Sequence, residues 1–205
     1  GPRRLLLAGV VLLLATVLIT TSVAAQKVME NVPSLQKINI EEHRGDTLPL
    51  DLTFVNEAGV NVELGQYYRD GKPVVLILGY YECPKLCNLV FNGMSDAITK
   101  LDWELGKQYR IVTVSIDPEE TPELAQAKKA NYWQTLGTDA DPVAWTFLTG
   151  SQDQITELAE AVGFEYYYDE ARDEYAHAAV ITITSPNGMI SRYLYGISFK
   201  PNDVK

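Results

Sequence analysis

The chain has 205 residues, of which 46% are hydrophobic, and it carries a formal net charge of −10. This acidic balance argues against nucleic acid or an anionic lipid surface as a partner. Two cysteines in a chain of this length are too few for a disulfide-stapled scaffold. About 180 residues follow residue 25, which is enough for one well-buried domain.

Residues 1–25 predict a signal peptide or a membrane anchor. Arg3 and Arg4 precede an uncharged apolar run that ends in small residues, as in an export signal. The same run is about 32 Å long as a helix, so it could also span a bilayer. Basic residues before the run would keep the N-terminus in the cytoplasm and the rest outside. Residues 26–46 are polar and weakly patterned, which predicts a linker before a domain at 47–205.

From residue 47 onward, apolar runs alternate with helical patterns. We expect a hairpin over 48–64 with its turn at 56–59, a buried strand at 73–81, a helix from 83 to about 105 and a second buried strand at 109–116. A helix starting at Pro122, a strand over 144–150 and a capped helix over 151–163 follow. A hairpin over 178–196, turning at 185–188, closes the series.

This order predicts an α/β fold with a central sheet and helices on its faces. A helix would normally cover the last hairpin of such a sheet. The sequence reaches Lys205 about where that helix would begin, so we expect the helix to be missing.

The two cysteines, Cys83 and Cys87, lie where a predicted buried strand passes into a predicted helix. Four positions along a helix make about one turn, so both sulfurs can point the same way. Unpaired N–H groups at a helix start favour the thiolate form of cysteine. Such a pair suits either reversible disulfide formation or binding of a soft metal ion. A static disulfide and two unrelated buried cysteines are the plainer alternatives.

A third ligand would favour a metal site over a redox pair, and the chain offers two histidines. His43 falls in the predicted linker and is expected to be solvated. His177 precedes the last hairpin, and loops at that place can come near the end of the cysteine-bearing strand. A lone histidine is more often a surface or hydrogen-bonding residue. Two thiolates and an imidazole would suit Cu(I), or Cu(II) with an added ligand, whereas structural zinc normally takes four protein ligands.

Three motifs give the sequence a family resemblance. Cys83-Pro84-x-x-Cys87 follows one strand, Ser115-Ile116-Asp117-Pro118 follows the next, and His177 precedes the final hairpin. This combination resembles the Sco/SenC copper-protein family over about residues 47–195. Asn88 stands where the family usually has proline, and Ala176 where it usually has aspartate, which indicates a divergent bacterial branch.

The resemblance implies a thioredoxin-like fold, with a mixed sheet, that binds one copper ion through Cys83, Cys87 and His177. It also implies a metallochaperone, not primarily an enzyme, that assembles the binuclear copper centre of cytochrome c oxidase. The partner would be a respiratory oxidase subunit or another copper-accepting membrane protein. The expected location is the periplasmic side of the bacterial inner membrane, anchored there or exported after signal cleavage.

The sequence also allows other functions. The same cysteines could act catalytically in a thiol–disulfide oxidoreductase that reduces client cysteines before copper insertion. A peroxidase on the same scaffold is a weaker alternative. Asp117 is either a turn residue before Pro118 or an outer partner of the site. The tyrosines at 80, 81 and 166–168 are expected in the core and on the sheet surface more than on a docking face.

Overall fold

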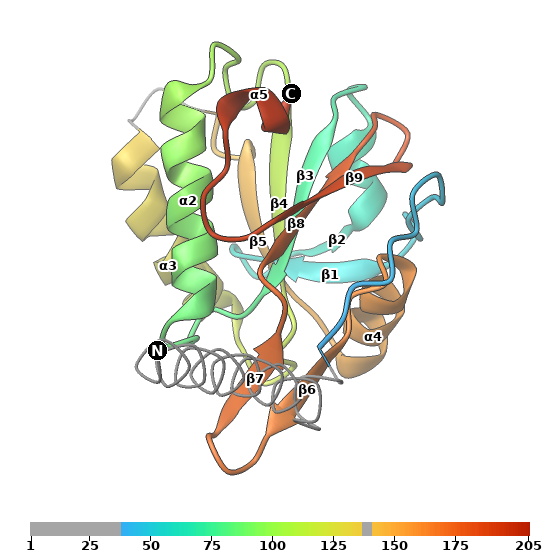
Figure 1. Cartoon of the computed structure of the whole chain (residues 1–205), viewed down its shortest axis with the longest axis vertical. Coiled ribbons are helices and arrows are strands. Elements are labelled where there is room, and N and C mark those ends of the chain that lie inside the picture. The colour runs from blue at the N-terminus through green and yellow to red at the C-terminus, as the bar shows by residue number, and fades with distance from the viewer. Residues whose placement is uncertain (1–37, 137–140) are drawn as a thin grey trace, which may run out of the picture. The chain divides into compact units, whose positions relative to one another are not determined.

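The computed structural model describes residues 38–136 and 141–205 (Figure 1). The predicted signal or anchor at 1–25 and most of the predicted linker therefore lie outside the described residues. Within the described ranges, every helix is too short or too polar to cross a bilayer. Residues Ile38–Lys205 form one compact unit.

The centre of this unit is a seven-stranded mixed sheet in the order β2-β1-β5-β4-β3-β8-β9. Its strands are β1 (Thr53–Asn56), β2 (Asn61–Glu63), β3 (Val74–Gly79), β4 (Arg110–Ser115), β5 (Trp145–Thr149), β8 (Val180–Thr184) and β9 (Ile190–Tyr195). The three middle strands β3, β4 and β5 run parallel, and the outer pairs are antiparallel. Every residue of β3 and β5 is buried, which explains the uninterrupted apolar sequence of β3.

Two helices connect the parallel strands, α2 (Leu86–Lys100) between β3 and β4 and α3 (Pro122–Leu136) between β4 and β5, and a third helix, α4 (Gln152–Ala161), follows β5. A 3-10 helix, η1 (Leu64–Tyr68), precedes β3. Figure 1 shows α2 and α3 together on one side of the sheet and α4 on the other side. Right-handed crossovers place α2 and α3 on the same side, because the connections from β3 to β4 and from β4 to β5 join parallel strands and advance in the same direction across the sheet.

Helix α2 carries the second cysteine and is fixed by a stripe of buried side chains. Cys87, Val90, Phe91 and Met94 are each at most 3% exposed, at spacings of three and four residues. Gly93 lies against the backbone before α5, where the Cβ of any other residue would collide with the Ile197 carbonyl oxygen. Cys87 is therefore held in place by the packing of the whole helix.

The helix predicted from residue 83 to about 105 begins later and ends earlier than expected. Lys85 is its N-cap, and the backbone leaves helical geometry at Leu101. Cys87 consequently lies in the first turn of α2, while Cys83 and Pro84 lie in the loop that joins β3 to the helix.

A second, two-stranded sheet stands apart from the main sheet. It pairs β6 (Tyr166–Asp169) with β7 (Glu174–His177), and Tyr166 is the partner of His177. The alternating strands and the turn expected over 178–196 are confirmed as β8 and β9. The β6–β7 hairpin was not among the predicted elements, and it places His177 at the end of a strand.

Residues 38–46, expected to be part of a linker, are hydrogen-bonded to the domain. Ile40 pairs with Phe164 in an isolated bridge, and the Glu41 N–H donates to the Gly163 carbonyl at 2.9 Å. Further along, the Gly45 N–H donates to the carbonyl of Ile190 at 2.9 Å. This segment therefore packs along the chain's surface instead of crossing solvent.

The expectation that no helix follows the last hairpin is wrong. A one-turn helix, α5 (Pro201–Val204), starts at a proline in its first turn and buries Val204. Arg192 of β9 donates to the Asp203 carbonyl at 3.2 Å, and Lys205 forms an ion pair with Asp102 just beyond α2. Proline at the first helical position loses no hydrogen bond, which favours a helix start there.

Candidate metal centre

The two cysteines are free, buried and close together at the junction of β3 and α2. The Cys87 N–H donates to the Cys83 sulfur at 3.3 Å, since it is one of the unpaired N–H groups at a helix start. The Tyr80 N–H donates to the Cys87 sulfur at 3.4 Å. Backbone donors therefore surround both sulfurs and favour thiolate charge.

His177 reaches this pair from the end of β7. Its Nε2 lies 3.1 Å from the Cys87 sulfur, and its ring is enclosed by Tyr80 and Phe164. Its Nδ1 lies 2.9 Å from the Ala178 carbonyl oxygen, to which it can only donate. This hydrogen bond places the ring proton on Nδ1 and leaves the Nε2 lone pair facing the sulfurs.

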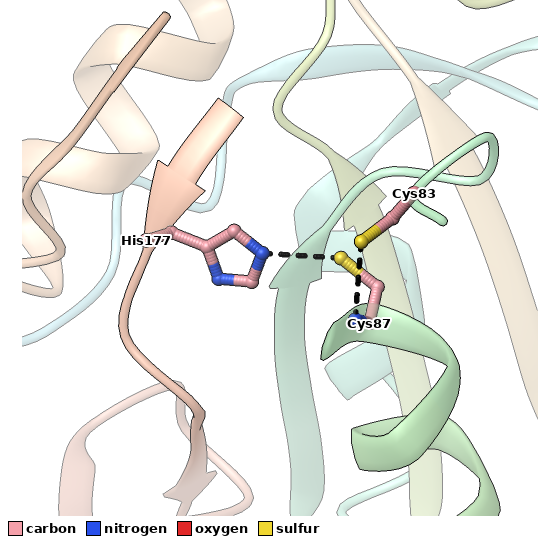
Figure 2. A group of neighbouring side chains, drawn as sticks. All are labelled: Cys83, Cys87 and His177. Atoms are coloured by element: carbon pink, nitrogen blue, oxygen red, sulfur yellow. Dashed lines mark hydrogen bonds between the residues drawn. The ribbon is translucent and has the colours of Figure 1, made fainter. Parts of the chain in front are cut away.

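Figure 2 shows the three side chains converging from two separate segments of the chain. Their ligand atoms all lie within 4.8 Å of one another, and each residue is at most 6% exposed. Within the ranges 38–136 and 141–205, no other group of three or more His, Cys, Asp or Glu side chains meets this criterion. The structure thus brings together the three residues expected from the sequence.

The donor set fits a copper ion better than structural zinc. Two sulfurs and one imidazole nitrogen are soft ligands of the kind that Cu(I) takes, and the cluster holds three residues where structural zinc normally has four. Because all three side chains are buried, an ion bound here would be largely shielded from solvent.

The two thiols differ in acidity because they share one site. A hydrogen bond from Cys87 lowers the pKa of Cys83, and nearby backbone N–H groups lower it further against the effect of burial. Burial raises the pKa of Cys87, and the neighbouring Cys83 sulfur raises it again. One proton is therefore retained between two sulfurs, and a bound metal ion would displace it.

A lysine from α3 lies close to the sulfur pair. The Lys128 ammonium donates to Asn88 Oδ1 at 2.9 Å, and Asn88 Nδ2 donates to the Cys83 carbonyl at 2.9 Å. Burial lowers the pKa of Lys128, while the charges of Cys87, Glu120 and Cys83 oppose that shift. Asn88 thus links the cysteine loop to a positive charge.

Several other residues considered in the sequence do not join the cluster. His43 Nδ1 bonds to the Ala161 carbonyl oxygen at 3.1 Å, in the docked segment 38–46. Asp117 accepts the Glu119 N–H at 2.9 Å, which is the contact of a turn residue. Tyr80 and Tyr81 are buried, whereas Tyr168 is 46% exposed.

Sequence reasoning missed one residue near the site. Glu120 is 6% exposed, and its carboxylate accepts N–H groups from the loop that leads to Cys83. Asp117, three positions earlier, was the acidic candidate that the sequence offered in this segment. A single buried carboxylate in a turn leaves no periodic pattern in the sequence, so only its contacts in the fold identify it.

Comparisons with known proteins agree with this geometry. The sequence pattern of the SCO1/SenC family matches residues 42–203. A comparison with curated proteins finds no match. Among solved structures, a protein of Aquifex aeolicus VF5 is 24% identical with a TM-score of 0.69, over 78% of this chain and 89% of that one.

Two further solved structures carry more descriptive names. Arabidopsis thaliana ScoI with copper bound is 21% identical, with a TM-score of 0.61 over 75% of this chain and 90% of that one. BsSco, a Sco-family cytochrome c oxidase assembly protein with a disulfide switch, is 25% identical, with a TM-score of 0.60 over 80% and 91%. Because the family pattern spans most of the chain and the fold agrees, this chain belongs to the SCO1/SenC family.

Proposed function

We propose that this protein is a copper metallochaperone that holds one copper ion between Cys83, Cys87 and His177. The observation that carries the proposal is the convergence of three soft ligand atoms within 4.8 Å in a buried setting. Arabidopsis thaliana ScoI and Bradyrhizobium japonicum ScoI are relatives solved with copper bound, which supports copper as the cargo.

Loading would be coupled to proton release and to thiol redox state. Copper binding displaces the remaining thiol protons, so the affinity would rise with pH over the range in which the sulfurs deprotonate. Formation of a Cys83–Cys87 disulfide would remove two of the three ligands. The chain would therefore accept copper only in its dithiol form.

Delivery requires a partner whose own ligands compete for the copper ion. A thiolate or imidazole of the partner could replace His177 and the cysteines one at a time. We propose a respiratory oxidase subunit or another copper-accepting membrane protein as this partner, because BsSco is a cytochrome c oxidase assembly protein. We further propose that residues 1–25 tether or export the domain to the periplasmic side of the inner membrane.

A second candidate function uses the same pair without metal. Cys83 has a lowered pKa, as the attacking thiol of an exchange reaction requires, and Cys87 lies beside it to resolve the mixed disulfide. In that reaction the two thiols would give two electrons and two protons to a client disulfide, and Cys83 and Cys87 would become a disulfide.

The test is copper binding by the reduced full-length protein and two histidine variants. His177→Ala removes a proposed ligand, while His43→Ala removes the other histidine of the chain and serves as the matched control. We expect one copper per chain in the wild type and in His43→Ala. We expect the affinity of His177→Ala to fall by more than the roughly 10- to 100-fold typical of losing an outer partner. No bound copper in any of the three proteins, with thiols that still cycle, would refute the copper proposal and favour the reductase.

A further inference from the structure

Glu120 holds the loop that carries the first cysteine. It lies in the turn between β4 and α3, and its side chain is buried at 6% exposure. The Tyr81 N–H donates to its two carboxylate oxygens at 2.6 and 2.8 Å, and the Glu82 N–H donates at 2.7 Å. The Ser115 hydroxyl donates at 2.6 Å. Since all these groups act as donors, the arrangement suits an ionised carboxylate.

These contacts matter because the loop has no regular structure of its own. Residues 80–85 lie between the end of β3 and the start of α2. The Tyr81 and Glu82 N–H groups therefore have no strand or helix partner, and Glu120 is the acceptor that they find. Buried N–H groups without an acceptor are costly, so the loop's position depends on this carboxylate.

The loop is also held on its other side. The Asn88 side chain donates to the Cys83 carbonyl at 2.9 Å, and Lys128 donates to Asn88. The backbone at Cys83 is thus held on both sides, by Glu120 at the two preceding N–H groups and by Asn88 at the Cys83 carbonyl. Both Glu120 and Lys128 belong to the β4–α3 segment, which makes that segment the support of the cysteine loop.

We propose that Glu120 is a positioning residue for the metal centre, because it fixes the backbone before Cys83 and thereby the separation and orientation of the two sulfurs. Its consequence for copper rests on the proposed function, but its consequence for the two thiols does not. Removal of the carboxylate is expected to change copper affinity, the visible spectrum of the copper–thiolate centre and the dithiol–disulfide equilibrium together.

The chain offers a matched control for a role in folding alone. Glu57 is a second carboxylate that is mostly shielded from solvent, with a side-chain exposure of 15%. It accepts a backbone N–H as well, that of Phe147, at 3.2 Å. It also pairs with Lys129, and none of its hydrogen bonds involves the cysteine loop. Glu57→Gln should therefore lower stability without changing the sulfurs.

The experiment compares Glu120→Gln and Glu57→Gln in the full-length protein. Gln keeps the size of Glu, but its NH2 group faces N–H donors and cannot accept from them. Without copper, the readouts are the alkylation rates of the reduced thiols and their equilibrium with a glutathione buffer. With copper, they are affinity and thiolate-to-copper absorption, and denaturant unfolding gives the stability of each variant.

We expect Glu120→Gln to lower copper affinity about 10- to 100-fold and to shift the absorption band. We also expect Glu120→Gln to alter the alkylation rates of the thiols. Glu57→Gln should match the wild type in copper affinity, absorption band and alkylation rates. If Glu120→Gln does not fold, Ser115→Ala removes a single donor from the same carboxylate and should give smaller changes of the same sign.

The proposal would be overturned if Glu120→Gln and Glu57→Gln lost similar amounts of stability and also had the same thiol alkylation rates, glutathione equilibrium and copper affinity. A wild-type protein that binds no copper would refute the proposed function alone. In that case the alkylation rates and the glutathione equilibrium still decide: a change confined to Glu120→Gln supports the positioning role, and no change overturns it.

Discussion

Gly79, the last residue of β3, is the position where a single methyl group should disturb the metal centre most directly. A Cβ there would lie 3.2 Å from the Cys87 sulfur and 3.6 Å from Phe91 Cζ. Phe91 is fully buried in the core and cannot move aside easily. In Gly79→Ala the strain must therefore be relieved at the Cys87 sulfur, by a shift of a few tenths of an ångström.

The two effects of this substitution on stability oppose each other. Replacing a strand glycine by alanine gains about 0.5–1 kcal/mol in backbone entropy, while overpacking costs about 1–3 kcal/mol. The net loss is about 0–2.5 kcal/mol, which corresponds to a fall in Tm of less than about 10 °C in a domain of this size. The variant should fold.

Copper binding should suffer more than folding. Metal–ligand distances hold to about 0.2 Å, so a displaced Cys87 sulfur loses much of its bond to the ion. We expect the copper affinity of Gly79→Ala to fall at least about tenfold, equivalent to about 1.4 kcal/mol. The assay is competition for Cu(I) against a chelator of known affinity, together with thermal unfolding of the copper-free protein.

Gly65→Ala is the control, because its Cβ would meet the Leu50 carbonyl oxygen at 2.9 Å and contacts neither cysteine. It should lose stability and keep wild-type copper affinity. An unchanged copper affinity in Gly79→Ala, with a lowered Tm, would mean that the sulfur accommodates the shift freely. The reasoning from packing to ligand geometry would then be wrong.

Two further predictions concern the rest of the domain. A hydrogen bond from Arg110, assisted by Lys72, lowers the pKa of Asp70 from 3.8 to about 2, so its contribution to stability is present above that range and is lost as the pH falls through it. Asp70→Asn should therefore be less stable than the wild type at pH 7 in denaturant titrations, with a difference that shrinks between pH 4 and 2. A difference independent of pH would contradict this. In Gly163→Ala, a new Cβ would collide with the Glu41 carbonyl oxygen at a φ of +62°, so limited proteolysis should release residues 38–46 faster. Unchanged cleavage would show that the segment does not depend on this contact.

The sequence alone predicted the parts of the fold that depend on neighbouring residues. The apolar runs at 73–81 and 109–116 became β3 and β4, because strands buried on both faces need no polar alternation. The capping box of Ser151 with Gln154 fixed the start of α4, since both partners lie within one turn. The sequence also showed Cys83 and Cys87 as a pair directly after a predicted strand.

Other features were decided by contacts between residues far apart in the chain. His177 and Cys87 are 90 positions apart in the chain, and their contact depends on the β6–β7 hairpin, which no local sequence pattern predicted. The hydrogen bond from the Tyr81 N–H to Glu120, which holds the cysteine loop, joins residues 39 positions apart. Sequence patterns report periodicity over one or two turns, whereas these side chains meet because the sheet order places their elements side by side. The motif therefore determined which atoms could bind a metal, and the tertiary structure determined that they meet and what holds them in place.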